Sequence, residues 1–274
     1  MTRHAEPLED PISAAYISWC IAEGEPHNTV RRRRAVLRSV GNAGVAARED
    51  VEAWWATRRD LAATTRSNDL AVLRSFYRWC QIWEKRDDDP SIRLKAPRTS
   101  SGAPKPISRG DLQRILEQVD DKPQLRRAVL LGAWAGLRRE EAARLDWRDV
   151  DADTRRAQVK GKGGKTRSVT FSARLLAELG DHLGSGNVVT GVERPWAPDT
   201  LGRKVNAAIA AAGVDGTFHK LRHRYGSVAY QRTKDPKALA EQMGHASVNT
   251  TMSFYAAAAD DAGQAIADAV SDDD

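Results

Sequence analysis

Apolar residues recur every three or four positions along most of the first ninety residues, with charged residues between them. This spacing is typical of amphipathic helices, which bury one face against their neighbours. It predicts four helices: Ile12 to about Glu23, a second with Asn28 as its N-cap, about Arg48 to Leu61, and Thr65 to about Trp83. Because each helix has an apolar side to bury, we expect one small all-helical domain over residues 1–89.

The composition changes at residues 90–106, where prolines and a Ser-Ser-Gly-Ala-Pro run replace the periodic apolar residues. Proline and glycine interrupt regular structure, and proline-rich segments tend to be extended. We therefore expect residues 90–106 to be an interdomain linker, followed by a second domain over residues 107–274.

The second domain combines helical spacing with one alternating segment. Ser108 is placed to cap a helix that runs to Val119, and an apolar helix follows from about Gln124 to Ala135. Two alternating runs, 157–160 and 167–171, flank a glycine-rich turn and predict a β-hairpin. Helical patterns then cover most of residues 172–183, 199–212, 219–231, 236–243, 247–257 and 260–271. The predicted fold class is mainly α with a small β-sheet.

The charge is unevenly distributed along the chain. The net charge is +6, but the last nineteen residues hold six aspartates and no lysine or arginine. The first 255 residues therefore have 43 basic and 31 acidic side chains, a net charge of +12. A basic body with an acidic tail indicates a polyanionic partner, and nucleic acid is one candidate.

Other features of the composition exclude several classes of protein. No apolar run approaches the length of about 20 residues that a membrane helix needs, and the polar N-terminus is not a signal peptide. We therefore expect a cytoplasmic protein, associated with DNA in a prokaryotic or virus-infected cell. The two cysteines, Cys20 and Cys80, form no CxxC pair, so we expect buried thiols and no metal site.

Five arginines lie within eight residues of the second predicted helix, without an acidic residue among them. They are either a solvated helix face or a clamp for DNA phosphates, to which arginine binds independently of sequence. Arg66, Arg74 and Arg78 on the polar side of the fourth helix extend the same surface. The candidate DNA-binding residues of the first domain are Arg31, Arg32, Arg33, Arg34, Arg38, Arg66 and Arg74.

Several motifs of the second domain suit the metal-free cleavage of a phosphodiester. That reaction needs a positioned hydroxyl, fixed cations around the negative oxygens of the transition state, and an acid for the leaving oxygen. Arginine suits the second task because its planar fork stays charged and donates paired hydrogen bonds. The motifs, in chain order, are Gly136-Leu137-Arg138, a lysine-rich hairpin turn, His219-Lys220-Leu221-Arg222, Gly244-His245 and Tyr255.

In this order the motifs resemble the catalytic residues of the tyrosine recombinases, the phage integrase family. The resemblance implies a SAM-like four-helix domain that binds core-type DNA sites, joined to an α+β catalytic domain. Within the second domain it implies that Tyr255 is the nucleophile, that Arg138 and Arg222 hold the phosphate oxygens, and that Glu141 orients Arg138. It further implies that Lys162 protonates the leaving 5′ oxygen, that His219 is the general base and that His245 binds the scissile phosphate. Lys160 and Lys165 flank Lys162 as further DNA contacts.

Each residue also has a plainer interpretation. Alone, Arg138 is a surface or capping arginine, the His219–Arg222 pair is a surface pair, His245 is a helix-terminal histidine and Tyr255 is a half-buried aromatic. The hairpin turn resembles a nucleotide-binding loop, but the required glycine five residues before Gly164 is missing and a strand follows. All of the positions are filled in order, which favours the recombinase interpretation.

The family resemblance implies a reaction and its partners. Tyr255 forms a 3′-phosphotyrosyl link, and two rounds of exchange pass through a Holliday junction without a cofactor. The partners are double-stranded DNA, three further copies of the chain in a homotetramer, and in some systems an accessory DNA-bending or directionality factor. Residues 262–270 are a candidate exchanged helix, and about ten residues before the first helix predict a short integrase without an arm-binding domain. The alternatives are a type IB topoisomerase, an inactive DNA-binding protein and a metal nuclease.

Overall fold

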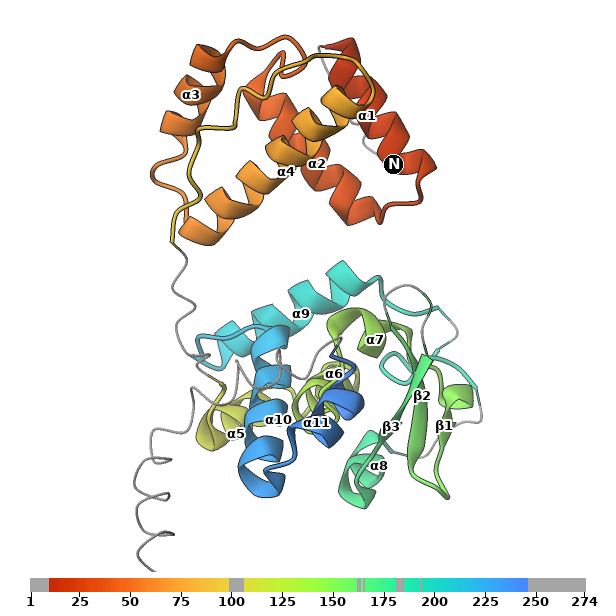
Figure 1. Ribbon diagram of the computed structural model, residues 1–274. Coiled ribbons are helices and arrows are strands. Elements are labelled where there is room, and N and C mark those ends of the chain that lie inside the picture. Colours follow the sequence, from red (N-terminus) through yellow and green to blue (C-terminus); the bar gives the residue numbers. More distant parts are fainter. Residues whose placement is uncertain are drawn as a thin grey trace, which may run out of the picture. The chain divides into compact units, whose positions relative to one another are not determined.

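The computed structural model describes residues 10–98, 106–161, 164, 166–180, 185–192 and 194–245. The chain divides into two compact units, Met1–Ser101 and Gly102–Asp274, each with its own core. The elements are helices apart from one small sheet in the second unit, which confirms the predicted fold class (Figure 1).

The first unit contains four helices, as the apolar pattern predicts. They are α1 (Pro11–Ala22), α2 (His27–Val40), α3 (Arg48–Thr57) and α4 (Ala63–Ile82). The carboxylate of Asp10 caps α1 by accepting the Ser13 N–H at 2.7 Å. The predicted cap of α2 is wrong, because the helix begins directly after Pro26 and Asn28 lies in its first turn. The third helix also ends earlier than expected.

The core of this unit is aromatic. Tyr16, Phe76 and Tyr77 are completely buried, and the rings of Tyr16 and Phe76 meet edge to face at 5.3 Å. Both cysteines are buried free thiols, as the sequence predicts.

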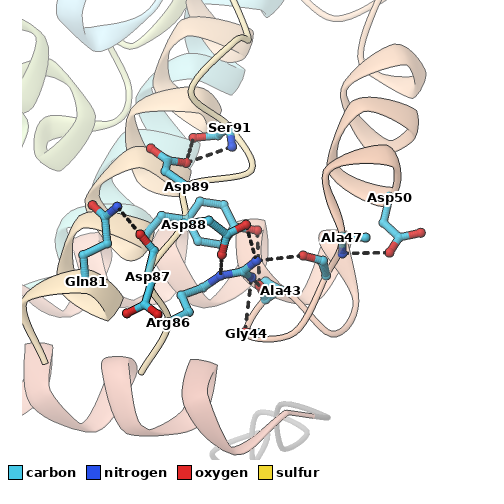
Figure 2. Close-up of polar contacts among 12 residues, drawn as sticks. Ala43, Gly44, Ala47, Asp50, Gln81, Arg86, Asp87, Asp88, Asp89 and Ser91 are labelled. Atoms are coloured by element: carbon cyan, nitrogen blue, oxygen red, sulfur yellow. Dashed lines mark hydrogen bonds and ion pairs between the residues drawn. The ribbon is translucent and has the colours of Figure 1, made fainter. Parts of the chain in front are cut away.

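The loop after α2 is held to the chain beyond α4 by one arginine. Figure 2 shows the Arg86 guanidinium between the carboxylate of Asp88 and the backbone of this loop. It donates to the carbonyls of Ala43, Gly44 and Ala46 at 3.5, 3.3 and 3.2 Å, and to Asp88 at 2.8 and 3.0 Å. A single side chain therefore satisfies three loop carbonyls.

The first part of the expected linker lies against this unit. Leu94 is 8% exposed and belongs to the aromatic core, and its carbonyl accepts a hydrogen bond from Arg74 at 2.6 Å. Residues 90–98 therefore differ from an extended linker, because an apolar side chain among the prolines is buried in the core.

The second unit contains seven helices and a 3-10 turn within its described residues. They are α5 (Arg109–Gln118), α6 (Pro123–Trp134), α7 (Arg139–Arg144), the turn Trp147–Asp149, α8 (Ala173–Leu179), α9 (Pro198–Ala211), α10 (Phe218–Thr233) and α11 (Pro236–Met243). Ser108 caps α5 as predicted, accepting the Asp111 N–H at 3.0 Å. The predicted helices 247–257 and 260–271 lie outside the described residues.

The predicted hairpin is present and forms part of a three-stranded antiparallel sheet. Its strands are β1 (Val150–Asp151), β2 (Arg156–Lys160) and β3 (Thr166–Thr170), in the order β1-β2-β3. Ala157 pairs with Val169, and both side chains are buried. The sequence does not reveal β1, because two residues are too short to show an alternation.

Helix α6 is the centre of this unit and packs against α5, α7, α8, α9 and α10. Its consecutive residues Val129, Leu130 and Leu131 are fully buried, as expected of a helix surrounded by others. Leu221 packs in the same core and orients α10, the helix that carries the His219–Arg222 motif. Within the described residues, no helix is both long enough and apolar enough to span a membrane.

Candidate active site

A sharp turn between α6 and α7 places Arg138. Gly136 has a φ of 65°, and a side chain there would collide with the ring of Tyr225, so the turn requires glycine. Arg138 then lies at the N-cap of α7, and its N–H donates to the Glu141 carboxylate at 2.7 Å. An acidic residue at the third position of a helix favours this arrangement, because the free N–H groups are there.

The carboxylate of Glu141 is the centre of the site. Its side chain is only 2% exposed, and it accepts hydrogen bonds from two guanidinium groups, those of Arg138 at 2.9 Å and Arg167 at 2.7 and 2.9 Å. Arg222 lies 3.9 Å away. Burial alone would raise the pKa of Glu141, but the bonds from Arg167 and Arg138 outweigh it and hold this pKa below its usual value. The carboxylate therefore stays charged.

Three arginines also donate to the last carbonyls of α11. Arg138 donates to Gly244 at 2.6 Å, and Arg222 donates to Met243 at 2.7 Å and to Gly136. Arg167 donates to Gln242 at 3.1 Å. Carbonyls at the end of a helix lack partners within the helix and carry its negative dipole, so they attract cations. The motifs around Arg138, Arg222 and His245 therefore come together at the end of α11.

The sequence did not identify Arg167 as a site residue. Along β3 the side chains alternate between exposed and buried, and Arg167 is on the same face as the buried Val169. A cation on the buried face of a strand needs a buried partner, and this pattern is the signal that could have identified it.

Three imidazoles lie near these arginines. The rings of His219 and His223 meet at 4.4 Å on consecutive turns of α10. Burial and the charges of Arg222 and Arg138 lower the pKa of His219, and the same causes, in the same order, lower the pKa of His245 to about 4. Burial is the largest cause of the lowered pKa in all three imidazoles, and the pKa of His223 also falls to about 4. At neutral pH they are uncharged.

A pocket opens beside Arg138, between the start of α10 and helices α7 and α9. It has a volume of about 340 Å³, and Arg138, His219 and Thr217 are among its lining residues. Arg138 is 35% exposed and Arg222 only 3%, so Arg138 is the outer and Arg222 the inner of the two predicted phosphate-binding arginines.

The neighbouring Arg139 also lines this pocket, but its guanidinium has other partners than that of Arg138. Its guanidinium makes ion pairs with Glu140 at 2.7 Å and with Asp199 of α9 at 3.1 Å. It is Arg138, therefore, that meets Glu141 and the end of α11.

Three predicted site residues, Lys162, Lys165 and Tyr255, lie outside the described residues. Lys160 is exposed at the end of β2, where it pairs with Thr166 across the hairpin.

The predicted phosphate clamp of the first unit is not one uniform surface. Arg33 points inward, where it makes an ion pair with Glu25 at 2.7 Å and donates to Ser75 at 2.9 Å and to Tyr16. The Arg33 guanidinium therefore has partners within the fold, and its role as a DNA contact stays a prediction.

The other arginines of this set vary in their surroundings. Arg32 pairs with buried Asp69 at 2.8 Å and remains 45% exposed, and Arg74 donates to the backbone as described above. Arg66 lies over the ring of Trp55 at 4.8 Å. Arg31 and Arg38 are exposed and Arg34 is half-buried.

The chain is similar to known recombinases and integrases in sequence and in fold. The tyrosine recombinase XerC of Xanthomonas campestris pv. campestris (strain B100) is 28% identical over 253 residues, which cover 88% of this chain and 74% of that protein. The integrase from mycobacterium phage Brujita shares 26% identity over 89% of this chain and 86% of that chain, with a TM-score of 0.50. A lambda integrase tetramer bound to a Holliday junction has the same fold, with a TM-score of 0.75 at 16% identity over 89% of this chain and 76% of that chain.

The fold is therefore that of lambda integrase, and the sequence is similar to that of a tyrosine recombinase. Residues 106–261, more than half of the chain, match the phage integrase family. The chain belongs to the phage integrase family, as its motifs predict.

Proposed function

We propose that this protein is a site-specific DNA recombinase that cuts and rejoins DNA through a covalent link to Tyr255. The observation that carries the proposal is the group of three guanidiniums around the single carboxylate of Glu141, next to a pocket lined by Arg138 and His219.

The charges of this group suit a phosphodiester under attack. Arg138, Arg167 and Arg222 carry three positive charges and Glu141 one negative charge, which leaves an excess of two. The pentacovalent transition state carries two negative charges on its non-bridging oxygens, one more than the phosphodiester itself. Fixed cations therefore stabilise the transition state more than the substrate.

The reaction follows from the predicted roles. The Tyr255 oxygen attacks phosphorus as His219, neutral at pH 7, accepts the phenol proton. The bond from phosphorus to the 5′ oxygen breaks, and Lys162 gives a proton to that oxygen. A 5′ hydroxyl of the partner duplex then attacks the phosphotyrosyl link and gives its proton back to Lys162. The bond from phosphorus to the Tyr255 oxygen breaks, and that oxygen takes its proton back from His219, which completes the exchange.

The proposal also covers the molecules that the protein binds and its location in the cell. We expect double-stranded DNA with core-type sites as substrate, and a homotetramer that acts through a Holliday junction; the lambda integrase neighbour is a tetramer on such a junction. Residues 262–270 are the segment we expect the copies to exchange. The protein would act in the cytoplasm on nucleoid or phage DNA, with an accessory DNA-bending or directionality factor where the site requires one.

The proposal is tested by trapping the covalent intermediate. The protein is incubated with a nicked duplex of its site, so that the short 5′ strand diffuses away, and the adduct is detected by denaturing electrophoresis. We expect an adduct from the parent chain, none from Tyr255→Phe, and an unchanged amount from Tyr230→Phe, a matched control in α10.

The remaining outcomes decide between the alternatives. DNA binding without an adduct would contradict the proposal and favour an inactive DNA-binding protein. An adduct with relaxation of supercoils but without crossover products between two sites would favour a topoisomerase.

A further inference from the structure

Arg167 contributes its charge to the site but has no assigned contact with the reacting groups, and all three of its guanidinium nitrogens donate to acceptors within the protein. Nη1 and Nη2 donate to the two oxygens of Glu141 at 2.7 and 2.9 Å, and Nε donates to the Gln242 carbonyl at 3.1 Å. Its side chain is 15% exposed, whereas that of Arg138 is 35% exposed. Arg167 is therefore directed into the protein, and Arg138 towards the pocket.

A second contact joins the same strand to the same helix. The side-chain amide of Gln242 accepts from the Thr170 N–H at 3.1 Å and donates to the Thr170 carbonyl at 2.8 Å. The amide thereby pairs with β3 as the backbone of a neighbouring strand would. Helix α11 is thus attached to β3 at two points, three residues apart along the strand.

The turn after α11 lies directly on Arg167. Gly244 has a φ of 66°, and a Cβ added to it would lie 2.8 Å from Nε and 2.9 Å from Cζ of Arg167. Only glycine allows so close an approach together with this backbone conformation. His245 follows immediately, so its place depends on the guanidinium beneath the turn.

We propose that Arg167 is a positioning residue of the strand-transfer site, which holds Glu141 and the Gly244–His245 turn in place. Its paired nitrogens fix the carboxylate that orients Arg138, and its third nitrogen fixes the end of α11. Because β3 directly follows the hairpin turn that contains Lys162, Arg167 also couples the lysine hairpin to the rest of the site. This inference rests on the proposed function.

Holding these three acceptors at once requires arginine rather than lysine at position 167. The acceptors are two carboxylate oxygens and a carbonyl, which the three nitrogens of one planar group reach together. A lysine ammonium keeps the charge but is a single point and does not reproduce this planar fork. The conservative variant therefore separates geometry from charge.

The first arm of the test uses the free protein. Histidine ring signals are followed by NMR in the parent chain, in Arg167→Met, in Arg167→Lys and in a control, Arg126→Met. The control removes another arginine–carboxylate pair of the same unit, with Glu178 at 2.6 Å, away from the site. We expect both Arg167 variants to shift the His245 signals, and Arg167→Met also to raise its pKa above about 4, while the control leaves both unchanged.

The second arm measures the rate of adduct formation at saturating nicked DNA. Arg167 would orient Glu141 as outer residues orient the ligands of a metal, and removing such outer residues commonly lowers activity about 10- to 100-fold. We expect Arg167→Met to lower the rate of adduct formation by a similar factor. The affinity for DNA should change less than about threefold, because Arg167 does not face the pocket. Arg167→Lys should fold like the parent and still lose rate, whereas Arg126→Met should not.

A double variant tests whether Arg167 acts through Glu141. The effects of Arg167→Met and Glu141→Gln should be non-additive by about 2- to 100-fold, since the two side chains share one interaction. Rates that simply multiply, or unchanged His245 signals in both Arg167 variants, would overturn the inference. If the parent chain forms no adduct but the His245 signals still shift, the proposed function fails and the positioning by Arg167 stands.

Discussion

At the scale of single residues, the site is governed by charges that share a small buried volume. Glu141 keeps its charge because guanidiniums surround it, and His245 is kept neutral by its burial and by the same guanidiniums. A neutral imidazole can accept a proton or hydrogen-bond a phosphate without adding charge to the substrate complex. Both groups therefore lack a proton at neutral pH: burial and the guanidiniums together lower the pKa of His245, whereas at Glu141 the guanidiniums lower the pKa against the effect of burial.

This protonation state predicts that acid destabilises the second unit. Unfolding returns His223 and His245 to a pKa near 6.5, from about 4 in the folded state. Between about pH 4 and pH 6.5 the unfolded chain then binds more protons, so stability is full above this window and falls as the pH drops through it. Each histidine contributes a slope of at most about 1.4 kcal/mol per pH unit.

Urea unfolding at several pH values measures this slope. His223→Gln should make it shallower by removing one of the two groups. Equal slopes for the variant and the parent chain between pH 4 and 6.5 would contradict the prediction.

At the scale of elements, the three arginines of the site meet at the end of α11, and Gly244 is the position there that we expect to be most sensitive to substitution. Gly244→Ala should destabilise the protein through its left-handed backbone, by roughly 1 kcal/mol, and further through the collision with Arg167. Gly213→Ala is a matched control, because Gly213 has a φ of 67° but no atom within 4 Å of an added Cβ.

Urea unfolding of both variants compares the two effects. We expect Gly244→Ala to lose more stability than Gly213→Ala and, unlike it, to lose most adduct formation. Equal losses of stability would show that the contact with Arg167 contributes nothing.

The elements also show how far the sequence alone could lead. Long amphipathic helices such as α4 and the hairpin of β2 and β3 were predictable, because their periodicity is repeated several times. The place of Arg138 was predictable from its motif, and the contact of Glu141 with it from the helix position of the acid. Arg167 was missed, because its partners lie 26 and 75 residues away in the sequence, in elements whose packing no local pattern reveals.

At the scale of the whole molecule, the chain consists of two units with separate cores, and each unit has its own stabilising contacts. Arg86 stabilises the first unit by joining the loop after α2 to the chain beyond α4, and the Glu141 cluster holds the second together. Neither set of bonds involves residues of the other unit. The stability of each unit should therefore respond to its own contacts.

Arg86→Met is expected to destabilise only the first unit, by about 1–3 kcal/mol, because it removes the donor to Asp88 and to the carbonyls of Gly44 and Ala46. Amide hydrogen exchange followed on peptides resolves the two units in the intact chain. Exchange should speed up in α2 and α4 and stay unchanged in α6 and α10. Arg93→Met, at an exposed arginine of the same unit, serves as control, and faster exchange in α10 of the Arg86 variant would refute this independence.

Every acceptor that orients Arg138 and Arg222 in the contacts above belongs to the chain itself: a carboxylate and the carbonyls of two glycines and a methionine. The direction of the two guanidiniums is therefore a property of the folded state. Donors that are fixed in this way need little reorganisation when negative charge develops on the phosphate. Mobile side chains would instead have to reorient in each turnover. In the proposed reaction, the contribution of these two arginines is thus fixed when the chain folds. Substitutions that loosen their contacts should slow the chemical step while DNA affinity is retained.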